Sequence, residues 1–273
     1  MTLIQKNRTK AILAAGDTAI GSMIQQLGNP DVPAILAAAG FDYAFIDLEH
    51  GSLDLQTTQV LVRSSLAHGI TPLVRVGELL YTLVARVLDA GAQGIILPRV
   101  EDPRLVEEAI SWTRYPPSGV RGFGISGPQL DYRPQSMVDI IDHLNRETMV
   151  VVQIESQAAV EAVDELLSVK GVDVALIGPA DLSIALGIPG ELENPRLLAA
   201  VDKCLESCRR HGVAPGIQVR DREAAARWIE RGIRMVGSGA EHIFMLDRAR
   251  EVSSALRQKT ATRSDVTTSS QRA

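Results

Sequence analysis

The chain has 273 residues, of which 45% are hydrophobic and 22% are charged, and its formal net charge is -5. These values are those of an ordinary globular protein, and a negatively charged chain with scattered arginines is a poor nucleic-acid partner. No apolar run approaches the roughly 20 residues that span a bilayer, and the N-terminus lacks the charged-then-apolar order of a signal peptide. We therefore expect a cytoplasmic protein that binds neither membrane nor nucleic acid.

Short β-rich runs alternate with helical stretches along the chain. Strands are predicted at Ala19–Ile24, Tyr43–Leu48, Pro72–Val76, Gly94–Val100, Met149–Glu155, Val174–Ile177, Pro215–Val219 and Arg234–Gly237. Helices are predicted after them at Asp31–Ala39, Gln56–His68, Leu79–Ala90, Pro103–Arg114, Ala158–Val169, Pro195–His211, Arg222–Arg231 and His242–Arg257. Eight such units within about 250 residues are typical of a (β/α)₈ TIM barrel. The first run is weak enough for the count to be off by one, and a doubly wound open sheet is the alternative fold.

Two segments interrupt this alternation. Tyr115 to Pro134 is rich in Gly, Pro and Arg and is read as a long insertion before another helical stretch, Met137–Arg146. The end of the chain is rich in Ser, Thr and Arg, which is typical of disorder. We therefore predict one barrel domain over residues 1–259 and a disordered tail over residues 260–273.

Cys204 and Cys208 are the only cysteines. Their spacing places both on one face of a predicted helix, where a disulfide would need strained geometry. Two thiols alone are also a poor metal site. We expect both to be reduced, as in cytoplasmic proteins.

Glu155 and Asp181 are the most informative pair of residues. Each follows an apolar run that is read as a buried strand, and a helical stretch separates the two runs. Consecutive strands of such a unit lie side by side and parallel, so both carboxylates are expected at the same edge of the sheet. Two carboxylates there repel each other unless a cation lies between them. Oxygen ligands on a rigid edge suit Mg²⁺ or Mn²⁺ and leave positions for water and substrate.

A polar cluster ends the second predicted strand, where Asp47, Glu49 and His50 follow an apolar run. In a barrel, functional side chains collect at the C-terminal ends of strands. A lone histidine in such a place is more often structural, but these three ionisable groups share an edge with Glu155 and Asp181. We expect His50 to act as general acid or base, oriented by Asp47 or another carboxylate.

Arg75 lies within the apolar run of the third predicted strand. A guanidinium in such a run needs an anionic partner, which is either a neighbouring acid or a substrate carboxylate or enolate oxygen. Gln153 precedes Glu155 by two positions and faces the same side of its strand, so it is expected to hydrogen-bond the metal shell or the general base.

The segment Gly178-Pro179-Ala180-Asp181 turns from the sixth strand into a short helix that we expect to begin at Leu182-Ser183. Exposed amides in such a turn can hold an anionic substrate oxygen beside a metal. The lysines are Lys6, Lys10, Lys170, Lys203 and Lys259, and none is expected at a strand C-terminus inside the barrel. A Schiff-base mechanism therefore lacks a nucleophile, and metal-stabilised enolate chemistry remains.

From about Ala19 to His242 the chain resembles the HpcH/HpaI aldolase family of metal-dependent pyruvate aldolases, which have a phosphoenolpyruvate/pyruvate-type barrel. The matching segments are Asn29–Pro30, Gly40–Asp42, Ile46–Gly51, Arg75, Asp89–Gly94, Pro98–Val100, Arg114–Gly122, Gln153–Glu155 and Ile177–Ser183. Each segment alone is weak evidence, but the ordered set is specific.

The resemblance implies that Glu155 and Asp181 bind the metal and that Glu49 holds metal-bound water. Arg75 would bind the keto acid and its enolate, and the amides around Ala180 and Asp181 would take its carboxylate.

His50 would work as acid and base with Asp47, and Asp89 would join that dyad from a neighbouring subunit. The resemblance further implies a homohexamer, a trimer of dimers with exchanged C-terminal helices, and a role at interfaces for the loop of Arg121.

Two departures from the family pattern touch the part of the pocket that would hold the aldehyde. Ile125–Gln129 replaces an Ala-Arg stretch, and Gln218 stands where an apolar residue is expected. The sequence therefore leaves the aldehyde unidentified.

Together these features predict a lyase that reversibly cleaves a 4-hydroxy-2-oxo acid into pyruvate, or an analogue, and an aldehyde. Its cofactor would be Mg²⁺ or Mn²⁺, with Co²⁺ a further candidate. One alternative is a synthase that couples an oxaloacetate-derived enolate to another acceptor, as citrate-forming relatives do. Another is a non-catalytic barrel that binds keto acids.

Overall fold

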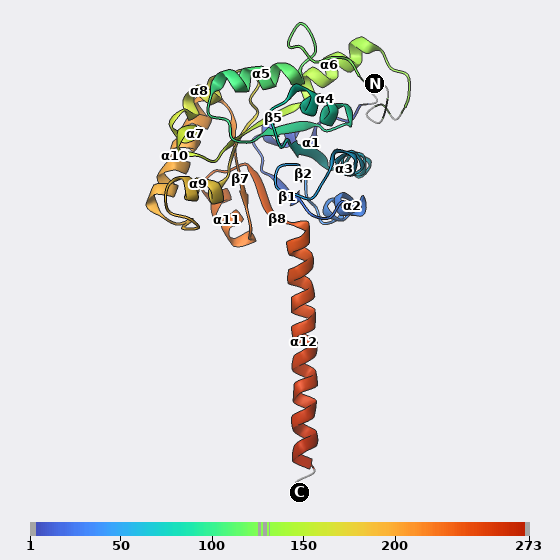
Figure 1. Ribbon diagram of the computed structural model, residues 1–273, viewed down its shortest axis with the longest axis vertical. Helices are drawn as coiled ribbons and strands as arrows, with labels where there is room; N and C mark the ends of the chain where they lie inside the picture. Colours follow the sequence, from blue (N-terminus) through green and yellow to red (C-terminus); the bar gives the residue numbers. More distant parts are fainter. Residues whose placement is uncertain (1–3, 125–126, 128–129, 131, 271–273) are drawn as a thin grey trace.

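The computed structural model describes residues 4–124, 127, 130 and 132–270, with the side chains of residues 260–270 left out. Eight parallel strands form a closed barrel in chain order, so the open-sheet alternative is wrong and the predicted (β/α)₈ TIM barrel is confirmed (Figure 1). The strands are β1 (Ala19–Ile24), β2 (Tyr43–Asp47), β3 (Thr71–Arg75), β4 (Gly94–Leu97), β5 (Met149–Ile154), β6 (Val174–Ile177), β7 (Ala214–Val219) and β8 (Met235–Ala240).

Helices surround the barrel and connect its strands (Figure 1). They are α1 (Arg8–Ala14), α2 (Asp31–Ala38), α3 (Leu55–Ala67), α4 (Tyr81–Asp89), α5 (Pro103–Thr113), α6 (Met137–Glu147), α7 (Gln157–Glu161), α8 (Val163–Ser168), α9 (Pro179–Ala185), α10 (Pro195–His211), α11 (Arg222–Glu230) and α12 (Glu241–Ser270). Short polar side chains begin many of them: Asp54, Asp102, Ser156, Asn194 and Asp221 each accept a backbone N–H of the first turn. Such N-caps satisfy amides that have no partner within the helix.

The strands are buried on both faces, which is why they read as continuous apolar runs. One cluster fills the barrel interior and includes Tyr43, Phe45, Leu73 and Met149. A larger cluster lies between the outer faces of the strands and the helices. The two layers fix each strand, because a shift by one residue would exchange its inner and outer side chains.

Three helices differ from the prediction. α1 is an unpredicted helix that contributes Leu13 to the cluster inside the barrel. The stretch predicted as one helix over Ala158–Val169 is divided into α7 and α8 at Ala162. α9 begins at Pro179 rather than at Leu182.

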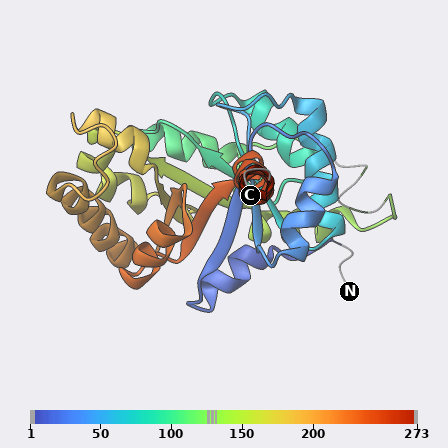
Figure 2. The ribbon, with the colours of Figure 1, turned by 90° about the horizontal axis from the view of Figure 1, so that it is seen from below.

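The last helix, α12, runs to Ser270, across most of the segment whose composition predicted disorder. Nothing in its sequence interrupts a helix, since it contains neither Gly nor Pro. It leaves the barrel as a long projection (Figure 1), and Figure 2 shows it near the middle of the ring when the molecule is viewed along the helix.

Several further predictions concern particular positions. Cys204 and Cys208 are buried and unpaired, as expected. Of the departing segment Ile125–Gln129, only Gly127 belongs to the described residues. Among the helices that the structure describes, none has the length and apolar character needed to cross a bilayer.

We predict that Gly21→Ala destabilises the barrel. Gly21 pairs with Tyr43 in neighbouring strands, and a methyl group at Gly21 would overlap the fully buried Tyr43 ring. Overpacking of this kind costs about 1–3 kcal/mol, which urea unfolding followed by circular dichroism would measure.

Ser22→Ala is the matched control in the same strand. The buried Ser22 hydroxyl has no hydrogen-bond partner among the described residues, so its removal should change the unfolding free energy by less than about 1 kcal/mol. Equal stability of the two variants would contradict the packing argument.

Candidate active site

The C-terminal ends of the strands bring most of the predicted functional residues together. They surround a cavity of about 270 Å³, which is lined on one side by His50, Arg75, Gln153, Gly178, Pro179, Ala180 and Asp181. These residues come from the ends of β2, β3, β5 and β6. This is the end of a barrel at which functional side chains collect.

Arg75 and Asp47 form a buried ion pair between neighbouring strands, whose register places the two residues opposite each other. Arg75 donates from Nε and Nη2 to the two oxygens of Asp47, at 2.8 and 2.6 Å. Burial raises the pKa of Asp47, but the bonds from Arg75 and from the amides of Glu49 and His50 outweigh burial and lower it. Asp47 therefore stays ionised. The sequence left open whether Arg75 pairs with an acid of the chain or with a substrate, and the structure shows that it pairs with Asp47.

Glu49 lies among three basic side chains. Its carboxylate is 3.1 Å from Arg75 Nη1, 2.9 Å from Arg99 Nε and 3.7 Å from His50 Nε2. Nevertheless Glu49 Oε2 is buried without a well-aligned hydrogen bond among the described residues. One oxygen of this carboxylate is thus able to accept another donor.

His50 lines the cavity with about half of its side chain exposed. Asp47 contacts its backbone N–H, at 3.4 Å. The structure gives no bond between Asp47 and the imidazole, so the carboxylate beside the ring is Glu49 rather than Asp47. Asp47 already uses its oxygens for Arg75, Gln25 and two amides, which explains the difference.

Glu155 is held from two sides at the end of β5. Its Oε1 accepts the backbone N–H of Arg99 at 2.9 Å, and its Oε2 accepts Gln153 Nε2. Arg99 has φ 54°, a left-handed conformation that costs a non-glycine residue roughly 1–2 kcal/mol. The residue with this conformation is the one whose amide binds Glu155.

Burial raises the pKa of Glu155, and the nearby charges of Glu49 and Asp181 raise it further, against the opposing effects of the Arg99 amide and the Arg75 charge. Carboxylates that destabilise one another in this way suit a divalent cation. In the part of the chain that the structure describes, no set of three or more acidic, His or Cys side chains is placed for a metal. Two protein ligands, Glu155 and Asp181, would leave coordination positions for water and substrate.

The first turn of α9 lies beside this acidic pair. Gly178 is the N-cap and Pro179 the first helical residue, so the amides of Ala180 and Asp181 have no partner within the helix. Ala180 and Asp181 also line the cavity. Both amides are therefore available to an anionic oxygen of a ligand.

Asp89 lies away from these residues. It ends α4, which leads back to the start of β4 at the opposite end of the barrel, and it pairs with Arg121 at 2.8 Å. Within one chain Asp89 does not meet His50. A role for it at this site stays a prediction that requires a neighbouring subunit.

The other half of the cavity was largely missed by the sequence analysis. It is formed by Met23, Gln25, Gln218, Val219, Arg220, His242 and Ile243, from the ends of β1, β7 and β8. Among them, only Gln218 was singled out. Arg220 directly follows β7, so the strand-end rule applied to Arg75 and Glu155 would also have found it.

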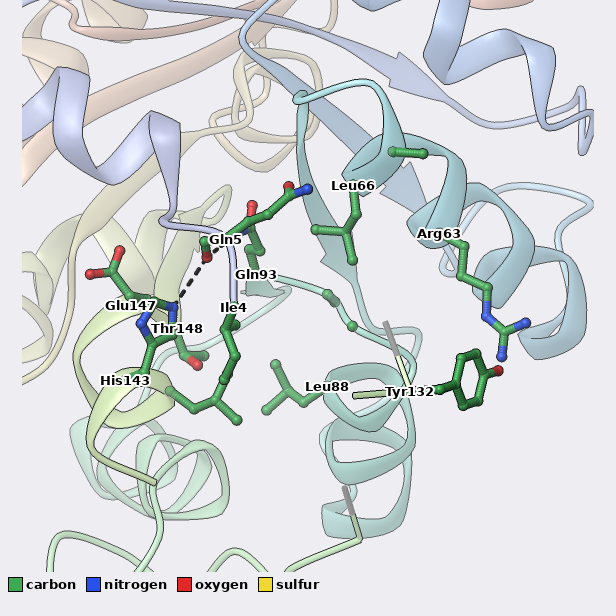
Figure 3. Close-up of a pocket in the computed structure, with 14 residues that line it drawn as sticks. Ile4, Gln5, Arg63, Leu66, Leu88, Gln93, Tyr132, His143, Glu147 and Thr148 are labelled. Carbon is green, nitrogen blue, oxygen red and sulfur yellow. Dashed lines mark hydrogen bonds between the residues drawn. The ribbon is translucent and has the colours of Figure 1, made fainter. Parts of the chain in front are cut away.

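A larger cavity, of about 460 Å³, lies at the opposite end of the barrel, beside the residues that precede β4 and β5. In Figure 3, His143 and Glu147 lie on one side of it and Arg63 and Tyr132 on the other. His143 Nε2 is 3.1 Å from the carbonyl oxygen of Gln5, a hydrogen bond that fixes the ring. None of the predicted metal or acid–base residues lines it, so the smaller cavity is the candidate site.

Comparisons with known proteins find similarity over most of the chain. Residues 23–248 match a family model described as HpcH/HpaI aldolase/citrate lyase. A 4-hydroxy-2-oxo-heptane-1,7-dioate aldolase from Escherichia coli is 34% identical over 250 residues, which cover 92% of this chain and 94% of the relative.

Solved structures show the same similarity. An HpcH/HpaI aldolase from Desulfitobacterium hafniense matches with a TM-score of 0.86 and 32% identity, over 91% of this chain and 96% of that one. The citrate synthase SbnG matches with a TM-score of 0.83 and 29% identity, over 95% and 99%.

We predict that Glu155→Gln stabilises the metal-free protein at neutral pH. Since the folded state raises the pKa of Glu155, its ionisation opposes folding as the pH rises through that pKa. The gain from the substitution should disappear in acid, below the pKa of an unfolded glutamate. Thermal unfolding in EDTA at several pH values measures this.

Asp47→Asn is the contrasting variant, because the pKa of Asp47 is lowered. The stability that Asp47 contributes is present above the pKa of an unfolded aspartate and is lost as the pH falls through the lower folded value. Its substitution leaves the buried Arg75 without its main partner, which costs about 3–5 kcal/mol at neutral pH. A destabilised Glu155→Gln protein would contradict the assigned repulsion.

Proposed function

Because the chain belongs to the HpcH/HpaI aldolase/citrate lyase family, we propose that it is a divalent-metal-dependent aldolase. It reversibly cleaves a 4-hydroxy-2-oxo acid into pyruvate, or a close analogue, and an aldehyde. The observation that supports this most is that Asp181, Arg75 and His50 line one cavity, with Glu155 close enough to Asp181 and Arg75 for their charges to shift its pKa. We place the enzyme in the cytoplasm.

Glu155 and Asp181 would hold the cation, which we propose to be Mg²⁺ or Mn²⁺, with Co²⁺ a further candidate. When bound, such an ion supplies Lewis acidity that stabilises negative charge on the oxygens of the keto acid. The Arg99 amide and Gln153 keep the Glu155 carboxylate in place. In the proposed enzyme, Gln153 and the amides of Ala180 and Asp181 also contact the substrate.

Cleavage breaks the bond between C3 and C4 of the substrate. His50 takes the proton of the 4-hydroxyl group, so that C4 leaves as the aldehyde carbonyl. The electron pair of the broken bond stays with C3 and its adjoining carbonyl group as an enolate, which takes up a proton at C3 to give pyruvate. In synthesis His50 returns its proton to the new hydroxyl group.

Arg75 stabilises the enolate oxygen by its charge. Asp47 is a positioning residue, because it holds the guanidinium through two hydrogen bonds while Arg75 still lines the cavity. Glu49 lies between Arg75 and the His50 ring. It can therefore orient the ring and accept a bound water.

A synthase is the second candidate function. It would use the same residues to couple an oxaloacetate-derived enolate to an acceptor, and it is favoured by the similarity to the citrate synthase SbnG over 95% of the chain. Product analysis after incubation with oxaloacetate, with and without acceptors, separates the two functions.

We further propose a homo-oligomer, a hexamer built as a trimer of dimers, in which α12 packs on a neighbouring subunit. α12 projects from the barrel and exposes Met245, Val252 and Leu256, each by 45% or more (Figure 1). These residues are seven and four positions apart, on one face of the helix. A projecting apolar face of this kind is stabilised by burial against another protein surface.

We predict that removal of the metal abolishes pyruvate release. EDTA-treated enzyme should lose activity with a 4-hydroxy-2-oxo acid and regain it with added Mg²⁺ or Mn²⁺. Asp181→Asn should weaken both rescue and the stabilisation by metal, which is about 2.7 kcal/mol at a hundred times the dissociation constant. Full turnover in EDTA would refute the mechanism.

A second prediction concerns assembly. The double variant Val252→Lys/Leu256→Lys should reduce the mass measured by light scattering, because two charges enter the proposed contact. Ser254→Lys is the matched control, since it lies on the other side of α12. An unchanged mass of the double variant would exclude this face as the contact.

A further inference from the structure

The two halves of the cavity differ in whether the arginine that lines them is paired with an acid. In the half formed by β2, β3, β5 and β6, Arg75 is paired with Asp47 and Glu49. In the other half, Arg220 follows β7 and lines the cavity. Among the described residues Arg220 has neither an ion pair nor a side-chain hydrogen bond.

The position of Arg220 is fixed by the neighbouring strands. β7 pairs with β8 up to Val219, opposite Ser238. Beside it, Gln218 donates from Nε2 to the carbonyl oxygens of Val219 and Gly239, at 3.3 and 3.2 Å. These bonds join the ends of β7 and β8 immediately before and beside Arg220, so its backbone has a defined place at the rim.

Other groups in this half can also meet a polar ligand. His242 lines the cavity from the first turn of α12. Its Nδ1 is buried and makes no hydrogen bond within the described chain, and it lies 3.6 Å from Glu241 Oε2. The apolar residues Met23, Val219 and Ile243 line the same half of the cavity. This half therefore offers an apolar surface for a short carbon chain and a basic group for its end.

The backbone of the neighbouring loop is held in place independently of any ligand. The buried Glu241 carboxylate accepts the amides of Gln25, Gln26 and Leu27, at 2.6 to 3.1 Å. Glu241 thus holds the loop after β1, and its Oε2 also lies 3.6 Å from His242 Nδ1. It does not compete for Arg220.

We infer that Arg220, together with His242, binds an acidic group at the far end of the aldehyde, either a carboxylate or a phosphate. The inference rests on the proposed aldolase function, in which the keto acid occupies the half with Glu155, Asp181 and Arg75. The aldehyde then extends into the half lined by Arg220. A guanidinium matches the two oxygens of a carboxylate or phosphate, and Arg220 determines the charge of the aldehyde that is accepted.

The test compares three aldehydes in the synthetic direction at saturating pyruvate and metal. Succinate semialdehyde carries a carboxylate, glyceraldehyde 3-phosphate a phosphate, and butanal neither. For the wild-type enzyme we expect kcat/KM for one acidic aldehyde to exceed that for butanal by at least about tenfold. Which acidic aldehyde is preferred identifies the group that Arg220 binds.

Arg220→Gln should lower that preference by about tenfold to a hundredfold, mainly through a higher KM for the acidic aldehyde. Arg220→Lys should keep part of the preference, because it keeps the charge but not the planar fork. Arg222→Gln is the matched control, since Arg222 is exposed and pairs with Glu223, and it should keep the wild-type preference.

The outcomes separate the inference from the proposed function. If no aldehyde reacts with pyruvate and no 4-hydroxy-2-oxo acid is cleaved, the aldolase function itself is wrong. If all three aldehydes react without preference for charge, or if Arg220→Gln keeps the wild-type preference, only the role of Arg220 is overturned.

Discussion

The buried ion pair between Asp47 and Arg75 is the interaction on which the candidate site depends. Register places the two residues opposite each other at the ends of β2 and β3, and the bonds are short and bidentate. A charge removed from water in this way is stable only with its partner. Because Asp47 satisfies Nε and Nη2, Arg75 is fixed in one orientation and still faces the cavity. The same carboxylate holds the amides of Glu49 and His50, so one residue orders most of the β2 end.

Around this pair, the barrel separates its charges. Glu155 and Asp181 stand at the ends of β5 and β6, close enough for the charge of Asp181 to raise the pKa of Glu155. The repulsion disfavours the ionised state of the isolated protein and favours a bound cation. On the far side of the cavity Arg220 has no partner in the described chain. In the proposed enzyme, one rim would hold a cation on one side and an anion on the other, separated by the space in which a keto acid and an aldehyde would meet.

Rigidity and exposure are also distributed unevenly. The strands and the layer around them are fully packed, which suits a scaffold that holds reacting groups in fixed positions. α12 contacts the barrel near its start, where Phe244 stacks on Phe41, and farther along it exposes the apolar side chains of Val252 and Leu256. The start of this helix also carries Glu241 and His242, so packing of α12 on a neighbouring subunit would be coupled to the structure of the cavity wall.

The sequence by itself determined the eight strands, because continuous apolar β-branched runs are typical of strands that are buried on both faces. It also determined that Glu155, Asp181, Arg75 and His50 would lie at one rim of the barrel. This second inference needs no measured distance, because parallel strands of one barrel all end at the same rim. Only the tertiary structure decided which acid pairs with Arg75, that the Arg99 amide joins Gln153 in holding Glu155, and that Arg220 lines the cavity. Those contacts depend on barrel closure and on the register of strands far apart in the chain, such as β1 and β8. Local pattern carries no information about closure, and for the same reason it did not predict α1, whose Leu13 is buried only because the barrel exists.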